Sequence, residues 1–226
     1  ANCCTFSRYW MHNAFLNIDN RKMSKSLGNF FTVRDILDQY DGQVLRYFML
    51  SVQYRSPLNF SRELMESAKT SYERIVNCAE NLRFLLEKAS GDTLTEAETA
   101  LLTQADAFRT QFETAMDDDF NTADAISAIS ELVKWINSHV NGSSSKAFIE
   151  TLQKELLDLA GVCGLIVERD NSLEDDLAAY VEEKIAERKA AKKARDFAKA
   201  DAIRDELKSK GIILEDTREG VKWKKA

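Results

Sequence analysis

Residues 61–92 read SRELMESAKTSYERIVNCAENLRFLLEKASGD, and their apolar side chains recur every three or four positions. This spacing places them on one face of an α-helix, so the stretch predicts a long amphipathic helix that ends near Ser90-Gly91-Asp92. The apolar face consists of Leu64, Ala68, Tyr72, Ile75, Ala79, Leu82 and Leu86. A helix of this kind buries its apolar face against a partner, so further helices are expected beside it.

Three more helices with one apolar face each follow in the sequence. Thr95 starts the first of them, Asn121 caps the next, and the last covers about residues 146–163. Short polar stretches such as residues 141–145 join them. Four helices in this order predict an up-and-down bundle, with Trp135 and the phenylalanines in the core or on helix faces.

Three consecutive carboxylates, Asp117, Asp118 and Asp119, precede the third bundle helix. Acidic runs can bind metal ions, but successive residues at a helix start point in different directions and cannot converge on one ion unaided. The positive end of the helix that Asn121 caps accounts for acidic residues at this place. We therefore expect a structural role for the run.

Upstream of the bundle, residues 22–29 read KMSKSLGN. The stretch puts two lysines three positions apart among small polar residues, a composition typical of a loop that reaches an anionic ligand. Two ammonium groups at this spacing can bracket a polyphosphate, with Ser24 and Ser26 as hydroxyl donors and Gly28 allowing close backbone approach. For a lysine pair taken alone, a solvated turn is the alternative.

The residues around this loop predict a support for it. A strand is expected over residues 9–18, which are rich in aromatic and β-prone types and end at the turn signal Asp19-Asn20. After the loop, Thr32 is expected to cap a helix over residues 33–40, and a second helix follows over residues 43–52.

Beyond the bundle the sequence predicts a small α+β unit. Residues 168–172 are a plausible linker, followed by helices over residues 173–194 and 198–208 and strands over 212–215 and 221–224. Basic residues stand beside aromatic ones here: Arg195 with Phe197, and Lys222 with Trp223. Such pairs can hold phosphates and unstacked bases, although the charge pattern by itself favours a solvated charged helix.

Composition gives the chain a mainly α fold class and limits its chemistry. One proline and eight glycines in 226 residues leave few breaks, which favours long helices. The net charge of −6 argues against a diffuse electrostatic grip on nucleic acid, so any RNA contact must use local basic patches. Four scattered cysteines indicate reduced thiols, and without a signal peptide or membrane span a cytoplasmic location is expected.

The KMSKS sequence is the signature loop of class I aminoacyl-tRNA synthetases, and other stretches narrow the match. They read YWMHN (9–13), GNFFTVRD (28–35), YRSPLNFS (54–61), MDDDFNT (116–122) and GIILED (211–216). With them the chain resembles cysteinyl-tRNA synthetase from end to end. The family's HIGH signature and its nucleotide-binding βαβ pattern do not occur here, so the resemblance implies the back half of such an enzyme.

The resemblance implies three domains and an activity. Residues 1–60 would end the catalytic domain and carry the signature loop with stem-contact helices, 61–167 would be a DALR-like helical bundle, and 168–226 an anticodon-binding domain. The family activates cysteine with ATP and transfers it to tRNA(Cys). Lys22 and Lys25 would be the catalytic residues, and Met23, Ser24 and Lys25 the ATP contacts.

The chain alone is expected to be inactive, because ATP and cysteine are bound mainly by the missing half. It is also expected to be a monomer. The zinc ion of the complete enzyme would be held by Cys, His and Glu residues upstream of Ala1, so no metal site is expected in this chain. Cys3 and Cys4 do not match that ligand set, and His12 is kept as a substrate-side candidate.

In the small C-terminal domain the resemblance implies anticodon contacts. Asp201 and Asp216 would accept hydrogen bonds from base edges, chiefly a guanine, and Phe197 would supply a stacking face where the family often has tryptophan. Lys192 stands where arginine can occur, which keeps the charge but not bidentate recognition. Trp223 also matches, with either an RNA contact or packing as its role.

Two other functions fit the residues. The chain could be a non-catalytic RNA-binding or structural fragment, or part of a paralogous cysteine ligase that uses an acceptor other than tRNA. A C-terminal unit of the anticodon-binding type favours the tRNA enzyme over that paralogue.

Overall fold

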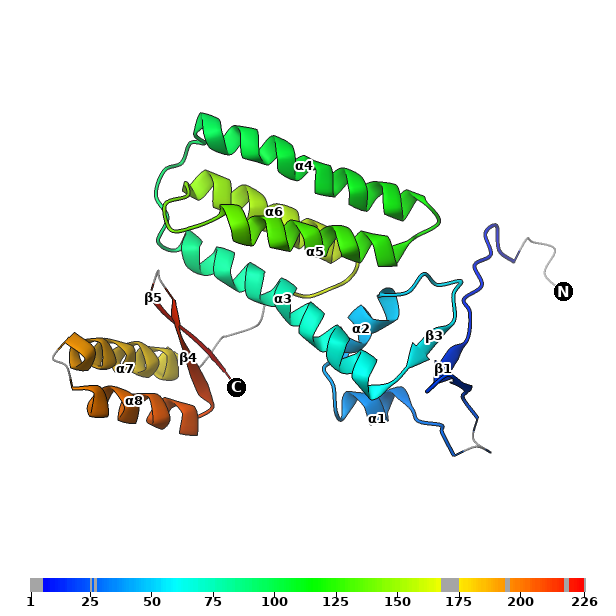
Figure 1. The fold of residues 1–226 in the computed structure, drawn as a ribbon, viewed down its shortest axis with the longest axis horizontal. Coiled ribbons are helices and arrows are strands. Elements are labelled where there is room, and N and C mark those ends of the chain that lie inside the picture. Colours follow the sequence, from blue (N-terminus) through cyan, green and yellow to red (C-terminus); the bar gives the residue numbers. More distant parts are fainter. Residues whose placement is uncertain are drawn as a thin grey trace. The chain divides into compact units, whose positions relative to one another are not determined.

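The computed structural model describes residues 6–24, 26, 28–167, 175–193, 196–217 and 220–225; for 175–179, 215–217, 220, 222 and 224–225 it describes the backbone alone. These residues form a mainly helical protein, as the sequence predicts, and they also form two small sheets (Figure 1). The chain divides into two compact units, Ala1–Glu168 and Arg169–Ala226. The further division of the first unit at residue 60 stays a prediction.

The first unit contains a short helical pair and the four-helix bundle. The pair is α1 (Val33–Leu37) and α2 (Gly42–Leu50), and the bundle is α3 (Arg62–Leu86), α4 (Glu96–Asp117), α5 (Thr122–His139) and α6 (Lys146–Val162). Thr32, Thr95 and Asn121 cap α1, α4 and α5 with their side chains, as expected. The caps accept backbone N–H groups that a helix start leaves without partners.

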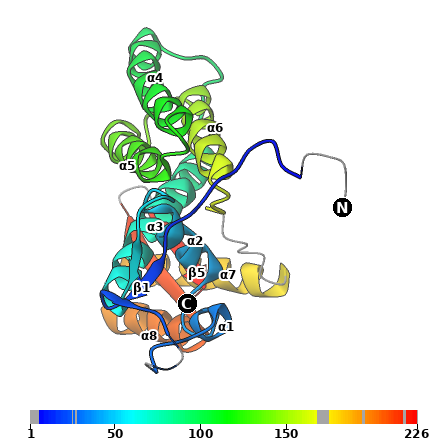
Figure 2. The same cartoon turned by 90° about the vertical axis from the view of Figure 1, so that its right-hand side faces the viewer.

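The bundle helices run alternately up and down. Glu98 near the start of α4 accepts hydrogen bonds from the N–H and hydroxyl of Ser145, the cap of α6, so these two helices begin at the same end. Figure 2 separates α5 from α6, which overlap in Figure 1. The core includes fully buried Met65, Leu82 and Leu132, each contributing about 1.5–3 kcal/mol by leaving water.

A three-stranded sheet of order β2-β1-β3 lies beside the helical pair. Strand β1 (Leu16–Ile18) pairs antiparallel with β2 (Arg21–Lys22) and parallel with β3 (Leu58–Phe60). The prediction of a strand over residues 9–18 is therefore wrong for its first seven residues. Leu16 pairs with Leu58, and the residue before Leu58 is Pro57, which has no N–H with which to extend the ladder.

The second unit is a helical hairpin followed by a β-hairpin. It contains α7 (Asp175–Lys193), α8 (Phe197–Ser209), β4 (Ile212–Thr217) and β5 (Gly220–Lys225). Its core is small and consists of Val181, Ile203, Leu207, Ile212 and Leu214, with Trp223 and other partly buried side chains packed against it. The predicted linker at 168–172 lies outside the described residues.

The structure corrects the explanation of the acidic run. Asp117 is the last residue of α4 and Asp118 its cap, so both stand at the negative end of that helix. Asp119 contacts residues of the 53–55 segment instead of the start of α5. The acidic residue in the first turn of α5 is Asp124, which accepts a hydrogen bond from the Asn121 side chain. The helix-dipole explanation is therefore wrong for Asp117 and does not account for Asp119.

Candidate functional site

A tight β-hairpin, β1–β2, leads directly into the KMSKSLGN stretch, residues 22–29, which we call the signature loop. Asp19 and Asn20 connect β1 and β2, and both have left-handed backbones, with φ of 47° and 60°. Two such residues fit the type I′ turn, whose twist matches that of the strands it joins. The turn is fixed from outside because the Asn20 N–H donates to the Asn59 side chain at 2.7 Å.

The Asn29 side chain closes the neck of the signature loop. Its Oδ1 accepts the Ser24 N–H at 2.9 Å, and its Nδ2 donates to the Lys22 carbonyl at 3.2 Å. One amide thus links the two ends of the loop and holds the backbone on both sides of Met23. The loop therefore leaves the sheet from a defined base.

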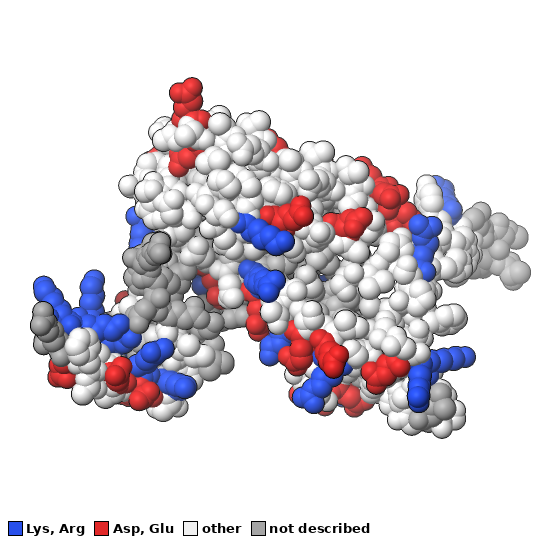
Figure 3. Space-filling view, viewed as in Figure 1, with Lys and Arg blue, Asp and Glu red and all other residues white. Residues whose placement is uncertain are grey.

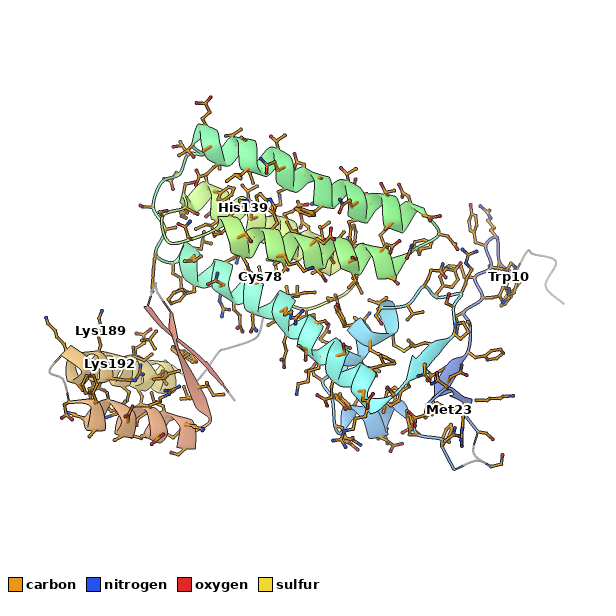
Figure 4. The ribbon with its side chains drawn as sticks, viewed as in Figure 1. Trp10, Met23, Cys78, His139, Lys189 and Lys192 are labelled. Atoms are coloured by element: carbon orange, nitrogen blue, oxygen red, sulfur yellow. The ribbon has the colours of Figure 1, made fainter. Side chains whose placement is uncertain are left out.

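The described side chains of the loop suit an anionic ligand. Lys22 is exposed, and Met23, labelled in Figure 4, is half-buried like Ser24. The hydroxyls of Ser24 and Ser26 lie 2.7 Å apart. Gly28 has a φ of 68°, a conformation that other residues rarely adopt. Lys25, the residue expected to make the chief ATP contact, lies outside the described residues.

A rigid base follows the loop. Thr32 forms a capping box with Asp35 at the start of α1. The backbone N–H and the hydroxyl of Thr32 both donate to the Asp35 carboxylate, and these hydrogen bonds lower the pKa of Asp35. Aromatic packing joins this region to the sheet: Phe60 of β3 lies between Phe31 and Phe48, with ring centroids 4.7 and 5.7 Å away. The expected pair of supporting helices is present.

In the second unit, one face of α8 carries two of the residues expected to contact RNA. Ala200, Ile203 and Leu207 are buried, whereas Phe197 and Asp201, one turn apart, are exposed. The exposed fraction of Phe197 is 63%. An aromatic ring left this open is available for stacking, and the carboxylate beside it can accept a hydrogen bond.

Basic side chains lie at the same end of this helical hairpin. Lys192 is exposed at the C-terminal end of α7, and the Asp196 N–H donates to the Ala191 carbonyl, which closes the short connection to Phe197. Figure 4 shows Lys189 and Lys192 side by side on α7, and Figure 3 shows Lys and Arg side chains gathered over this end of the unit. Positive charge thus lies at the end of α7 that leads to Phe197, the first residue of α8.

The two expected RNA contacts in the β-hairpin differ from these. Asp216 pairs with Val221 across the hairpin, but its side chain is not described. Trp223 pairs with Leu214 and packs, partly buried, against the core of the second unit. Of the two roles considered for Trp223, the structure supports packing.

The remaining candidates give no further site. Cys3 and Cys4 lie outside the described residues, and His12 is exposed with its ring stacked on Trp10 at 6.3 Å. Within the described ranges, no three His, Cys, Asp or Glu side chains are grouped as metal ligands, so these residues do not fit a zinc ion. No helix of the described part is long and apolar enough to cross a membrane.

Sequence reasoning missed the bracing residues. Asn29 follows directly after the glycine of the signature loop, and this position next to a left-handed residue was the available signal. Asn59 accepts a hydrogen bond from Asn20, 39 residues away, and Asp119 accepts one from Tyr54, 65 residues away. Nothing in the sequence next to Asn59 or Asp119 indicates these partners.

Comparison with known proteins matches both halves of the first unit. Residues 1–70 match the family model of the class I tRNA synthetase (C) catalytic domain, and residues 111–168 match the DALR domain. Proteins named cysteine–tRNA ligase are similar over the whole chain: 55% identical in Lachnospira eligens and 53% in Lachnoclostridium phytofermentans. One from Clostridioides difficile is 50% identical over 98% of the chain.

These relatives are longer proteins. The chain covers 47%, 49% and 47% of their respective lengths, so it spans about half of each. The similarity to these relatives covers the signature loop, the bundle and the second unit alike. The chain therefore belongs to the cysteine–tRNA ligase family of class I aminoacyl-tRNA synthetases.

Proposed function

We propose that this chain is part of an enzyme that activates cysteine with ATP and transfers it to tRNA(Cys). In this reaction a carboxylate oxygen of cysteine attacks the α-phosphate of ATP, cysteinyl-adenylate forms and pyrophosphate leaves. The adenylate then passes its cysteinyl group to the tRNA. The observation that carries the proposal is the braced signature loop within a chain 50–55% identical to named cysteine–tRNA ligases.

The signature loop would stabilise the charge that moves onto pyrophosphate. Lys22 lies exposed at the braced neck, and Lys25 follows three residues later in the loop. Positive groups placed where charge develops lower the energy of the transition state more than that of the bound substrate. The Ser24 hydroxyl and the backbone around Met23 would add hydrogen bonds to the phosphates. Lys25 is the chief ATP contact in this proposal, on the family resemblance.

The test is Lys25→Ala in the complete enzyme, measured by cysteine-dependent exchange between ATP and pyrophosphate. Removing one charge-stabilising group should lower kcat by roughly two or more orders of magnitude. Lys154→Ala is the control, because Lys154 is an exposed lysine on α6 of the bundle. An unchanged exchange rate in Lys25→Ala would contradict the proposed role of the loop.

The second unit would bind the anticodon arm of the tRNA. Lys192 would attract phosphates, Phe197 would stack on a base, and Asp201 would accept a hydrogen bond from a base edge. Asp216 and Trp223 complete the family's set, with Trp223 holding the hairpin in place. Phosphate contacts give affinity without sequence information, whereas a carboxylate against a base edge can discriminate.

The two kinds of contact can be separated by titrating the 226-residue chain with labelled anticodon stem-loops at two salt concentrations. Lys192→Ala should weaken binding to all stem-loops about equally and reduce the salt dependence. Asp201→Ala should chiefly remove the preference for a GCA anticodon, by about 1–3 kcal/mol if the contact resembles a good base-edge contact in DNA. A wild-type chain without preference for GCA would contradict anticodon reading and favour the structural-fragment alternative.

A further inference from the structure

The turn between α4 and α5 has an unusual backbone. Asp119 and Phe120 both have left-handed conformations, with φ of 53° and 54°. Residues with a Cβ rarely adopt this region, and two in succession require contacts that hold them there. Backbone hydrogen bonds hold the turn from within, from the Phe120 N–H to the Met116 carbonyl and from the Asn121 N–H to the Ala115 carbonyl. The Phe120 side chain is exposed, whereas that of Asp119 has partners elsewhere in the fold.

Asp119 is held by three consecutive residues of the segment that leads into β3. Its Oδ1 accepts the Tyr54 hydroxyl at 2.9 Å, and its Oδ2 lies 2.8 Å from the Arg55 guanidinium. The Gln53 side chain donates to the Asp119 carbonyl at 3.4 Å. We call these four residues the Asp119 clasp. The hydrogen bond to Asp119 also raises the pKa of the Tyr54 hydroxyl.

The same segment holds the strand that leads to the signature loop. The Tyr54 carbonyl accepts the Ala14 N–H at 2.9 Å, just before β1 begins. The next bond in the series runs from the Leu58 N–H to the Phe15 carbonyl, and β1 then pairs with β3. Tyr54 therefore contacts the bundle with its hydroxyl and the base of the signature hairpin with its backbone.

From these contacts we infer that Asp119 is a positioning residue for the signature loop. Through Tyr54, the Asp119 carboxylate fixes the position of the β1–β2 hairpin relative to the bundle. The hairpin in turn determines the position of Lys22, the last residue of β2. The link to catalysis rests on the proposed function. The mechanical link between Asp119 and the hairpin does not, and it can be tested separately.

Two glycine variants separate positioning from turn formation. Asp119→Gly relieves a left-handed backbone and removes the carboxylate contacts of the clasp to Tyr54 and Arg55. Phe120→Gly gives the same relief at the next residue and leaves the clasp intact. Both are made in the 226-residue chain and compared by amide hydrogen exchange. The reporters are the N–H of Ala14, bonded to Tyr54, and that of Asp19, bonded to Phe60.

Asp119→Gly should speed exchange at both reporter amides by roughly ten-fold, the scale of losing one hydrogen bond to a charged group. Amides within α6 should not change, and Phe120→Gly should leave the reporters at their wild-type rates. Reporter rates in Asp119→Gly that equal those of the wild type would overturn the inference. So would an equal acceleration in both variants, because turn formation alone would then explain it.

The catalytic consequence is measured in the complete enzyme. Asp119→Gly should lower kcat for cysteine-dependent exchange between ATP and pyrophosphate about ten-fold, with KM for ATP within about two-fold, because the loop acts mainly in the transition state. A wild-type kcat in Asp119→Gly would overturn the link between clasp and loop. If the complete wild-type enzyme shows no such exchange, the proposed function fails, and the hydrogen-exchange result still decides whether the clasp holds the hairpin.

Discussion

Glu98 stabilises two helix starts with one carboxylate, and its replacement should destabilise the bundle measurably. Oε2 accepts the N–H and hydroxyl of Thr95, the cap of α4, both at 2.9 Å. Ser145, the cap of α6, donates its N–H to Oε1 at 2.8 Å and its hydroxyl to Oε2 at 2.9 Å. Glu98→Ala removes the support of both caps.

The magnitude follows from the hydrogen bonds to the Glu98 carboxylate, because the caps Thr95 and Ser145 themselves remain. Losing hydrogen bonds to a charged group costs about 1.5–3 kcal/mol, so Glu98→Ala should lower the free energy of unfolding by about 2 kcal/mol. For a unit of this size that corresponds to a fall in Tm of roughly 4–8 °C. Glu96→Ala is the matched control, because Glu96 is exposed in the same first turn of α4 and should reveal the effect of losing a charge near the helix start.

The effect should also depend on pH. Although partial burial opposes ionisation, the hydrogen bonds from Thr95 and Ser145 lower the pKa of Glu98 from 4.5 to about 2. A depressed folded-state pKa stabilises the protein above the unfolded value, and this contribution is lost as the pH falls toward the folded value. The difference between wild type and Glu98→Ala should therefore be full at pH 7 and, on those two pKa values, less than half as large at about pH 3.

The assay is urea unfolding followed by circular dichroism at both pH values, with the control variant measured in parallel. Equal destabilisation by Glu98→Ala and Glu96→Ala would show that the shared carboxylate adds nothing beyond a charge near the helix start. A difference between wild type and Glu98→Ala that does not shrink in acid would refute the ionised, doubly bonded carboxylate.

Three further predictions concern single residues. Asn29→Ala should lower kcat for exchange between ATP and pyrophosphate in the complete enzyme by roughly ten-fold, because the loop loses the hydrogen bonds that close its neck; a wild-type kcat would contradict that role. Cys78 is buried, which raises its pKa to about 12, so a thiol reagent at pH 8 should label it only after unfolding, and fast labelling of the native chain would contradict its burial. Gly164→Ala should lower the free energy of unfolding by about 1 kcal/mol or more, since φ is 65° and the added Cβ would lie 3.1 Å from the Arg46 side chain. Gly161→Ala, in open space within α6, should leave that free energy unchanged or raise it. Urea unfolding measures both variants, and a Gly161→Ala chain less stable than Gly164→Ala would refute the prediction.

Much of the fold followed from the sequence alone, because helix formation depends on neighbouring residues. The apolar spacing over residues 61–92 and the capping residues Thr95 and Asn121 act within one or two turns, so both the helices and their first residues were predictable. The α8 face that carries Phe197 and Asp201 followed in the same way from a four-residue spacing.

The bracing contacts were decided by the tertiary structure. The capping box of Thr95 and Glu98 is local, but Ser145, which also bonds Glu98, is 47 residues away. A strand over residues 9–18 was predicted from its β-prone residues. In the structure only residues 16–18 form a strand, because the partner β3 is short and begins after Pro57. Asp119 reads as an acidic residue before a helix, and only folding brings it to Tyr54. Local patterns therefore determined which helices form, whereas contacts between distant segments determined how the signature loop is held, because no local sequence encodes its partner across the fold.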